Sequence, residues 1–290
     1  MINIKTFKEL LDVVNNSDKK IYEIAQEIEA KQLEIPVQEV REKVLSNLIA
    51  MKEAIKKGLN SNDLSFSKMC GNDCEKLINR YKSKNTVFSE TFKNILKYSF
   101  ATVEENARMG KIVACPTAGS CGIVPSTLIS YSETLHSTKD EEINALLTAG
   151  TIGKLVANKM ALAGAVMGCQ GECGVAAAMA AGAIVELSRG SSDEVIDAAA
   201  LALKNTMGLV CDPVGGLVEV PCVKRNAFLA MHATVASELA LSGIKSVIPL
   251  DEIIDATKQV GQLMSVSLKE SSEAGLATTK TGLSISEKLK

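Results

Sequence analysis

Residues 173–188 read CGVAAAMAAGAIVELS, and this stretch decides the fold. Alanine has the highest helix propensity of the amino acids, so the stretch predicts a helix. Because small side chains cover all of its faces, neighbouring helix backbones can approach it closely. We therefore expect this Ala/Gly-rich helix at the centre of an all-α fold, surrounded by amphipathic helices. The alternative is that the alanines serve helix propensity alone.

The rest of the chain supports the all-α assignment. It has 290 residues, of which 46% are hydrophobic and only 3% aromatic, a composition that suits a large core but not a β-sandwich or β-barrel. Apolar residues recur every three or four positions between Pro36 and Gly58, which we expect to begin and end one amphipathic helix. Capping-box patterns at 138–141 and 191–194 begin two more helices, the first of which is expected to run through Met167.

Charge and glycine content divide the chain near residue 100. Residues 1–100 hold 31 of the 66 charged residues, whereas 18 of the 20 glycines come later. We therefore expect charged amphipathic helices in the first part and tightly packed helices in the second, with candidate site loops at the helix breaks of the second part.

Net charge and hydropathy limit the partners and the location of the protein. The net charge is −2, so we expect no nucleic-acid partner. The longest uncharged apolar stretches, 160–171 and 173–185, are shorter than the roughly 18 residues of a membrane span. No signal peptide is evident, and we expect a soluble, cytoplasmic protein. In a reducing compartment the eight cysteines indicate metal binding, redox chemistry or core packing rather than disulfides.

Three of the cysteines lie at breaks in the helical pattern. No CxxC pair occurs, so spacing alone gives a weak metal signal, and buried free thiols are the alternative. Cys169, Cys211 and Cys222 lie in MGCQGECG, GLVCDPVGG and EVPCVKRN. Glycine and proline in these segments permit tight turns that bring distant thiolates together, with backbone N–H groups free to point at sulfur. Ordinary helix-capping loops are the other interpretation.

The segment CPTAGSCGIVP, residues 115–125, is a second candidate site. Its small residues Thr117, Gly119, Ser120 and Gly122 precede an expected helix, and such a loop can bind a carboxylate or phosphate through backbone N–H groups. The segment lacks the GKS or GKT end of a Walker loop and the GxGxxG spacing of a dinucleotide-binding turn. An ordinary turn of small residues is the alternative.

The sequence offers little support for a site built from histidines. The chain has only two histidines, which excludes a histidine-rich metal site and disfavours a Ser-His-Asp triad. His136 lies in a polar segment and is expected to be solvated. His232 lies in an apolar helical run and is expected to pack in the core.

Four segments together resemble the α chain of the iron–sulfur-dependent L-serine dehydratases: CPTAGSCGIVP, MGCQGECGVAAAMAAG, GLVCDPVGGLVEVPCVKRNA and LKESSEAGLA. The resemblance covers roughly residues 85–280. It implies an all-helical iron–sulfur catalytic domain over residues 86–290, preceded by a helical N-terminal segment over residues 1–85. It implies that a 4Fe–4S cluster is held by Cys169, Cys211 and Cys222. It also implies a substrate-binding loop, made of Thr117, Ala118, Gly119, Ser120, Cys121 and Gly122. The cysteines then predicted not to be ligands are Cys70, Cys74, Cys115 and Cys173.

The resemblance implies conversion of L-serine to pyruvate and ammonia. Three cysteine ligands leave one iron open, and this iron can act as a Lewis acid towards the serine hydroxyl. A base removes the Cα proton, and the resulting aminoacrylate tautomerises and hydrolyses. The loop over residues 117–122 would hold the substrate carboxylate.

The sequence departs from some members of this family in two respects. Those members carry a preceding α/β domain with a Ser-Ser-His-Thr motif, which is absent here. The sequence therefore resembles the two-chain type, in which a separate β chain supplies that domain, and we expect a hetero-oligomer. The catalytic base is unassigned in this chain and is expected from the partner's histidine-containing motif. Some members also end in a cysteine, whereas this sequence ends in SISEKLK.

Two other functions stay open on the residues alone. The first is an L-cysteine desulfidase of a related family, which could use a similar cluster. The second is a non-catalytic scaffold subunit, in which the cysteines are buried thiols. Products formed from serine and from cysteine, and the iron content of the protein, distinguish these functions.

Overall fold

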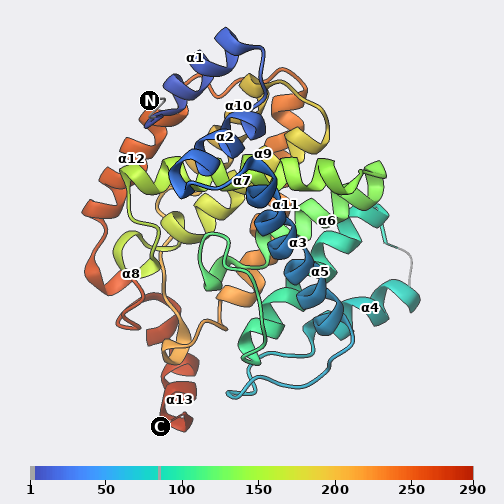
Figure 1. Cartoon of the computed structure of the whole chain (residues 1–290). Coiled ribbons are helices and arrows are strands. Elements are labelled where there is room, and N and C mark those ends of the chain that lie inside the picture. The colour runs from blue at the N-terminus through green and yellow to red at the C-terminus, as the bar shows by residue number, and fades with distance from the viewer. Residues whose placement is uncertain (1–3, 84–85, 290) are drawn as a thin grey trace.

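The structure is a computed structural model that describes residues 4–83 and 86–289. Over these residues the chain is all-α, as predicted, and its only strand-like pairing is an isolated bridge between Cys211 and Lys269. None of the described helices is long and apolar enough to cross a membrane. The helices, shown in Figure 1, are α1 (Phe7–Ser17), α2 (Ile21–Leu33), α3 (Val37–Leu59), α4 (Asp73–Ser83), α5 (Glu90–Ala107), α6 (Ile123–Leu135), α7 (Lys139–Lys159), α8 (Gly164–Met167), α9 (Val175–Leu187), α10 (Ser192–Lys204), α11 (Cys222–Leu241), α12 (Leu250–Leu263) and α13 (Lys280–Lys288).

Helix α9, the alanine-rich stretch, lies at the centre of the fold. Twelve of its 13 residues are buried. It packs against α6, α7, α10 and α11 (Figure 1). Where α7 comes closest, a Cβ built on Gly182 would lie 2.2 Å from Cδ1 of Ile152. The expected central packing of a helix with small side chains is therefore confirmed.

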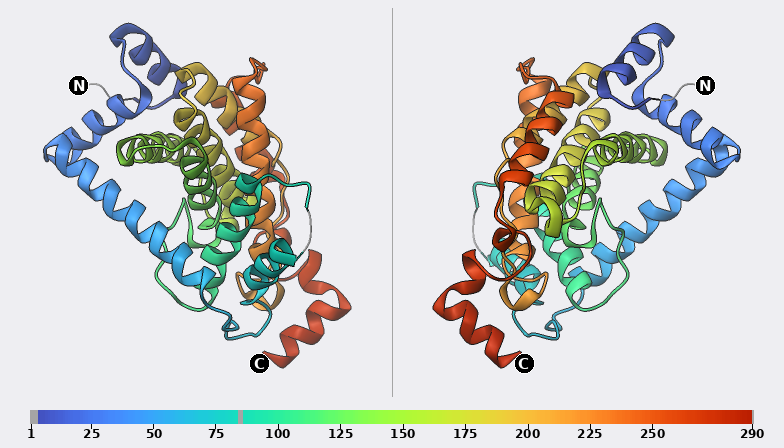
Figure 2. Two further views of the ribbon diagram at one scale, coloured as in Figure 1. Left: turned by 90° about the vertical axis from the view of Figure 1, so that its right-hand side faces the viewer. Right: turned by 90° about the vertical axis from the view of Figure 1, so that its left-hand side faces the viewer.

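Amphipathic helices surround this centre. Helix α2 packs on α7, and α3 extends from α2 to α5, as the two side views in Figure 2 show. Helices α1 and α12 pack against α10. The two predicted capping boxes are present, with Thr138 starting α7 and Ser191 starting α10.

Two helix ends differ from the sequence-based expectation. Helix α3 does not end at Gly58, because this glycine allows close contact with α5: a Cβ there would lie 2.0 Å from the carbonyl oxygen of Ala101. Helix α7 ends at Lys159 instead of running through Met167, since the next residue is extended (φ −144°, ψ 155°). After the break the chain passes through the short helix α8 and leads into the segment that carries Cys169.

Candidate active site

Three helix breaks supply the predicted site residues. Cys169 precedes the π-helical turn Gln170–Gly174, which leads into α9. Cys211 lies in the loop between α10 and α11, and Cys222 is the first residue of α11. The predicted substrate loop forms the 3-10 turn Ala118–Ser120 before α6, and this turn contacts both the π-helical turn and α11. The expectation that helix breaks present these residues is consistent with their placement.

Gly168 sets the direction of the chain as it enters the site. Its φ of +72° lies in the region that favours glycine, and a Cβ there would lie 2.8 Å from the carbonyl oxygen of Leu209. The same carbonyl accepts a hydrogen bond of 3.1 Å from the Gln170 N–H. The segment carrying Cys169 is thereby joined to the segment that leads to Cys211.

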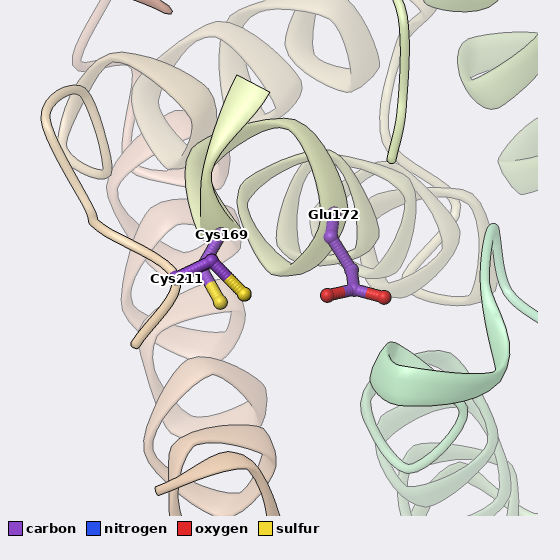
Figure 3. A group of neighbouring side chains, drawn as sticks. All are labelled: Cys169, Glu172 and Cys211. Atoms are coloured by element: carbon purple, nitrogen blue, oxygen red, sulfur yellow. The ribbon is translucent and has the colours of Figure 1, made fainter. Parts of the chain in front are cut away.

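Two of the three predicted ligand cysteines meet in one group with a carboxylate. The ligand atoms of Cys169, Glu172 and Cys211 all lie within 4.8 Å of one another. Figure 3 shows the two sulfur atoms side by side, with the Glu172 carboxylate across a short gap from them. Thiolates are the ligands of iron–sulfur clusters, so the two cysteines suit that chemistry.

The thiol of Cys169 is prepared to lose its proton. Its pKa is lowered to about 3, because the thiols of Cys173 and Cys211 hydrogen-bond to the sulfur and the Arg225 guanidinium lies beside it. The pKa of Cys211 is raised, chiefly because its thiol hydrogen-bonds to Cys169 and because it is buried. The group therefore stabilises one thiolate, which neighbouring thiols and a cation surround.

Arg225 of α11 is the cation of this group. Its Nη1 lies 3.0 Å from the Cys169 sulfur and donates a second hydrogen bond of 2.9 Å to the Val210 carbonyl. Its Nη2 forms a 3.3 Å ion pair with Asp212. These contacts fix the guanidinium beside the thiolate. The sequence pattern gave no indication of this role, because it depends on α11 packing beside the Cys169 turn.

Cys222 is buried but lies outside the group of three ligand atoms. Burial, followed by the charge on Cys169, raises its pKa to about 12. The sulfurs of Cys169 and Cys222 are thus near enough to interact electrostatically. The structure brings Cys169 and Cys211 together and places Cys222 at the adjacent start of α11, and its role as a third ligand stays a prediction.

Glu172 is a site residue that the sequence interpretation missed. Burial raises its pKa to about 7, against the opposing effect of a hydrogen bond from Thr117. The Thr117 hydroxyl donates that bond to Oε1 of Glu172, so the carboxylate joins the substrate loop to the cysteine group. One signal was available in the sequence: Glu172 is the only charged residue between Lys159 and Glu186.

A second carboxylate approaches the same place from the C-terminal part of the chain. A Cβ on Gly164 would lie 3.0 Å from the Cys211 sulfur and 3.3 Å from an oxygen of each of Glu172 and Glu270. The Glu270 N–H also donates a 2.7 Å hydrogen bond to the carbonyl of Cys211. Glycine at 164 therefore keeps open a space that is bordered by a thiol and two carboxyl groups.

The predicted substrate loop is held mainly by its own polar groups. Thr117 and Ser120 form a reciprocal capping box, and the Ser120 hydroxyl donates to the carbonyl of Cys115 at 3.1 Å. The Cys121 N–H donates to the Ala118 carbonyl at 3.3 Å. A side chain at Gly119 would collide with Glu172, since a Cβ would lie 2.6 Å from its Oε1. The loop therefore passes very close to the Glu172 carboxylate.

Asn226 connects the substrate loop to the helix that carries Cys222. Its Nδ2 donates to the carbonyl of Gly119 at 2.7 Å and to that of Cys222 at 3.0 Å. Its Oδ1 accepts the Gly122 N–H at 3.0 Å. Asn226 is fully buried, and it fixes the loop relative to α11.

The two histidines lie outside this group of residues. His136 is exposed at the C-terminal end of α6, where it adopts φ 54°. Nε2 of His232 lies 2.9 Å from the carbonyl oxygen of Ala202 in α10. His136 is solvated as expected, whereas His232 is only partly buried and does not lie in the core.

Comparison with known proteins identifies the family of this chain. The model of the family described as "Serine dehydratase alpha chain" matches residues 16–277. This chain belongs to that family. The "Probable L-serine dehydratase, alpha chain" of Bacillus subtilis (strain 168) is 42% identical over 287 residues, which cover 98% of this chain and 95% of the relative. The "L-serine dehydratase, alpha chain" of Peptoniphilus asaccharolyticus is 37% identical over 282 residues, or 97% of each chain.

Another serine dehydratase relative is a longer protein. The "L-serine dehydratase" of Streptomyces coelicolor (strain ATCC BAA-471 / A3(2) / M145) is 36% identical over 246 residues, which cover 82% of this chain but 53% of the relative. The serine dehydratase alpha-chain family inferred from four sequence segments is thus confirmed, and the family match includes every site residue named above.

Proposed function

We propose that this chain is the catalytic α chain of an L-serine dehydratase, which converts L-serine to pyruvate and ammonia. The observation that carries the proposal is the group formed by Cys169, Cys211 and Glu172, whose ligand atoms lie within 4.8 Å of one another. Thr117 joins this group to the substrate loop through its hydrogen bond to Glu172. Relatives that match nearly the full chain carry the name of this activity.

We also propose that Cys169, Cys211 and Cys222 hold a 4Fe–4S cluster. The donor chemistry supports this, because a thiolate-favouring Cys169 lies beside a second cysteine and a cation that offsets negative charge. When bound, the cluster supplies an open iron that acts as a Lewis acid towards the substrate hydroxyl.

The residues of the substrate loop, Thr117 to Gly122, then bind and orient L-serine. The N–H groups of Cys121 and Gly122 are used within the fold, whereas those of Ala118 and Gly119 find no acceptor among the described residues. These two N–H groups would donate to the substrate carboxylate. Glu172 holds the Thr117 hydroxyl at the same place, and Asn226 fixes the loop against α11.

A β chain would complete the active site as part of a hetero-oligomer. In this proposal the β chain carries an α/β domain and supplies the base that removes the Cα proton. The extra length of the Streptomyces relative supports it, and so does the placement of His136 and His232 away from the candidate site. Residues 86–290 would form the catalytic domain and residues 1–85 a helical segment packed on it.

Co-expression with a candidate β chain tests the proposal. After anaerobic purification and cluster reconstitution, we expect pyruvate from L-serine, together with iron and sulfide bound to the complex. A higher rate from L-cysteine than from L-serine would identify a cysteine desulfidase instead. An iron-free complex without either activity would identify a scaffold subunit.

A further inference from the structure

The turn that precedes Cys222 contains a buried carboxylate. Glu219 lies three residues before Cys222, and its carbonyl accepts a 2.9 Å hydrogen bond from the Val223 N–H in the first turn of α11. The residue is only 6% exposed. A buried carboxylate needs hydrogen-bond donors, so its partners determine how firmly this turn is held.

Three donors from the N-terminal segment meet the Glu219 carboxylate. Its Oε2 accepts from Ser65 Oγ at 2.6 Å, Ser67 Oγ at 2.7 Å and Cys70 Sγ at 3.1 Å. Hydrogen bonds to an ionised group are stronger than those between neutral groups. These donors come from a loop that precedes Glu219 by about 150 residues, as the separations of 149 to 154 show.

The same part of the chain also binds a residue that follows Cys222. Asp73, the first residue of α4, forms a 2.6 Å ion pair with Lys224, two residues after Cys222. Glu219 and Lys224 thus lie on either side of Cys222 in the sequence, and both side chains are bound by residues 65–73.

Helix α5 and the residue that follows it bind the loop through hydrogen bonds. Glu104, which is fully buried, accepts the N–H of Asp73 at 2.7 Å and that of Gly71 at 3.3 Å. Arg108 Nη1 donates to the carbonyls of Asp63 and Gly71, both at 2.9 Å. The loop is therefore fixed at both ends and joins α5 to the start of α11.

We infer that residues 65–73, here named the clamp loop, position Cys222 for cluster binding. The inference rests on the proposed function, because Cys222 is a ligand only there. Ser65 and Ser67 are positioning residues: they act on Cys222 through Glu219 and touch neither substrate nor cluster. The clamp loop thus gives the N-terminal segment a role in the active site.

Hydrogen–deuterium exchange on the apo full-length chain tests the clamp. In S65A/S67A, exchange of residues 213–224 is expected to accelerate about tenfold or more, because two hydrogen bonds to a buried charge are lost. Ser67→Thr keeps a hydroxyl and should stay near the wild type. Ser61→Ala is the matched control, since the Ser61 hydroxyl bonds to Asp63 and not to Glu219. Should S65A/S67A fail to fold, Glu219→Gln replaces it.

The reconstituted complex with the β chain gives a second readout. S65A/S67A should lose more than half of its iron and alter the electron paramagnetic resonance spectrum of the reduced cluster, whereas Ser67→Thr should retain the wild-type iron content and spectrum. Wild-type exchange at residues 213–224 together with an unchanged spectrum would overturn the clamp. If instead Cys222→Ala kept its full iron content, the proposed ligand set would fail, and the exchange result would still report on the clamp loop.

Discussion

The guanidinium of Arg225 lies against the sulfur of Cys169, with 3.0 Å between Nη1 and Sγ. The thiols of Cys173 and Cys211 approach the same sulfur, so three groups together lower the pKa of Cys169 to about 3. A thiolate is the form that would bind the proposed cluster, and Arg225 offsets its charge. Arg225 therefore prepares the proposed site in the apo protein.

Replacing Arg225 by methionine should raise the pKa of Cys169. Loss of a charged hydrogen-bond donor predicts a rise of about one to two units in the apo chain. Ultraviolet absorbance of the thiolate, titrated with and without the further change Cys169→Ser, measures it. Arg189→Met is the control, because Arg189 is exposed and pairs with Glu141. An unshifted titration in Arg225→Met would contradict the assigned role.

Separate alanine substitutions of Cys169, Cys211 and Cys222 should each abolish the cluster absorbance and the serine-dependent formation of pyruvate. Each removes one of the three proposed thiolate ligands. Cys74→Ser is the control, since Cys74 lies at α4 and its thiol donates to the Lys97 carbonyl at 3.4 Å. A full cluster in Cys211→Ala would show that the ligand assignment is wrong.

Glu172 predicts a pH dependence of stability in the apo chain. Its pKa is about 7 in the folded state and 4.5 as the ordinary value, so folding favours the protonated carboxyl. The contribution of Glu172 to the free energy of unfolding is therefore fully present below pH 4.5 and is lost as the pH rises through 7. The free energy of unfolding falls by about 3 kcal/mol over this range. Urea unfolding of the wild type and Glu172→Gln at several pH values measures this contribution. Equal pH slopes for the two proteins would refute it.

Replacing one glycine in α9 and one in α7 by alanine should change stability in opposite directions. Gly182→Ala should lower the free energy of unfolding by about 1–3 kcal/mol, because the added Cβ would lie 2.2 Å from Ile152. Gly150→Ala, on α7, is the matched control, since no atom lies within 4 Å of its Cβ position. Higher helix propensity should stabilise that variant by up to about 1 kcal/mol. The denaturant midpoints of the two variants measure these effects. Equal changes in midpoint would argue against close packing of α7 and α9.

Local sequence patterns predicted the helices well and predicted their ends less well. The capping boxes at Thr138 and Ser191 satisfy helix N–H groups with side chains three residues away, so they can be recognised without tertiary structure. The ends near Gly58 and Lys159 depend on what the next residues contact elsewhere. Glycine at position 58 looks like a helix stop, but it lies inside a helix where α5 passes closely.

Some residues of the candidate site could be identified from the sequence, and one could not. Cys169, Cys211 and Cys222 could be selected from their glycine- and proline-rich breaks and from family resemblance. Glu172 could have been found as the single charge in an apolar run. Arg225 could not, because nothing near it in the sequence marks it as a partner of a sulfur 56 residues away.

The sequence by itself determined the all-α class, the central alanine-rich helix and the family, because helix propensity, small side-chain size and short motifs are local properties. Tertiary structure alone decided which groups meet. The contacts of Thr117 with Glu172 and of Ser65 with Glu219 join residues 55 and 154 positions apart. Such pairs arise from the packing of whole helices, and burial then makes each carboxylate depend on the donors that packing brings to it.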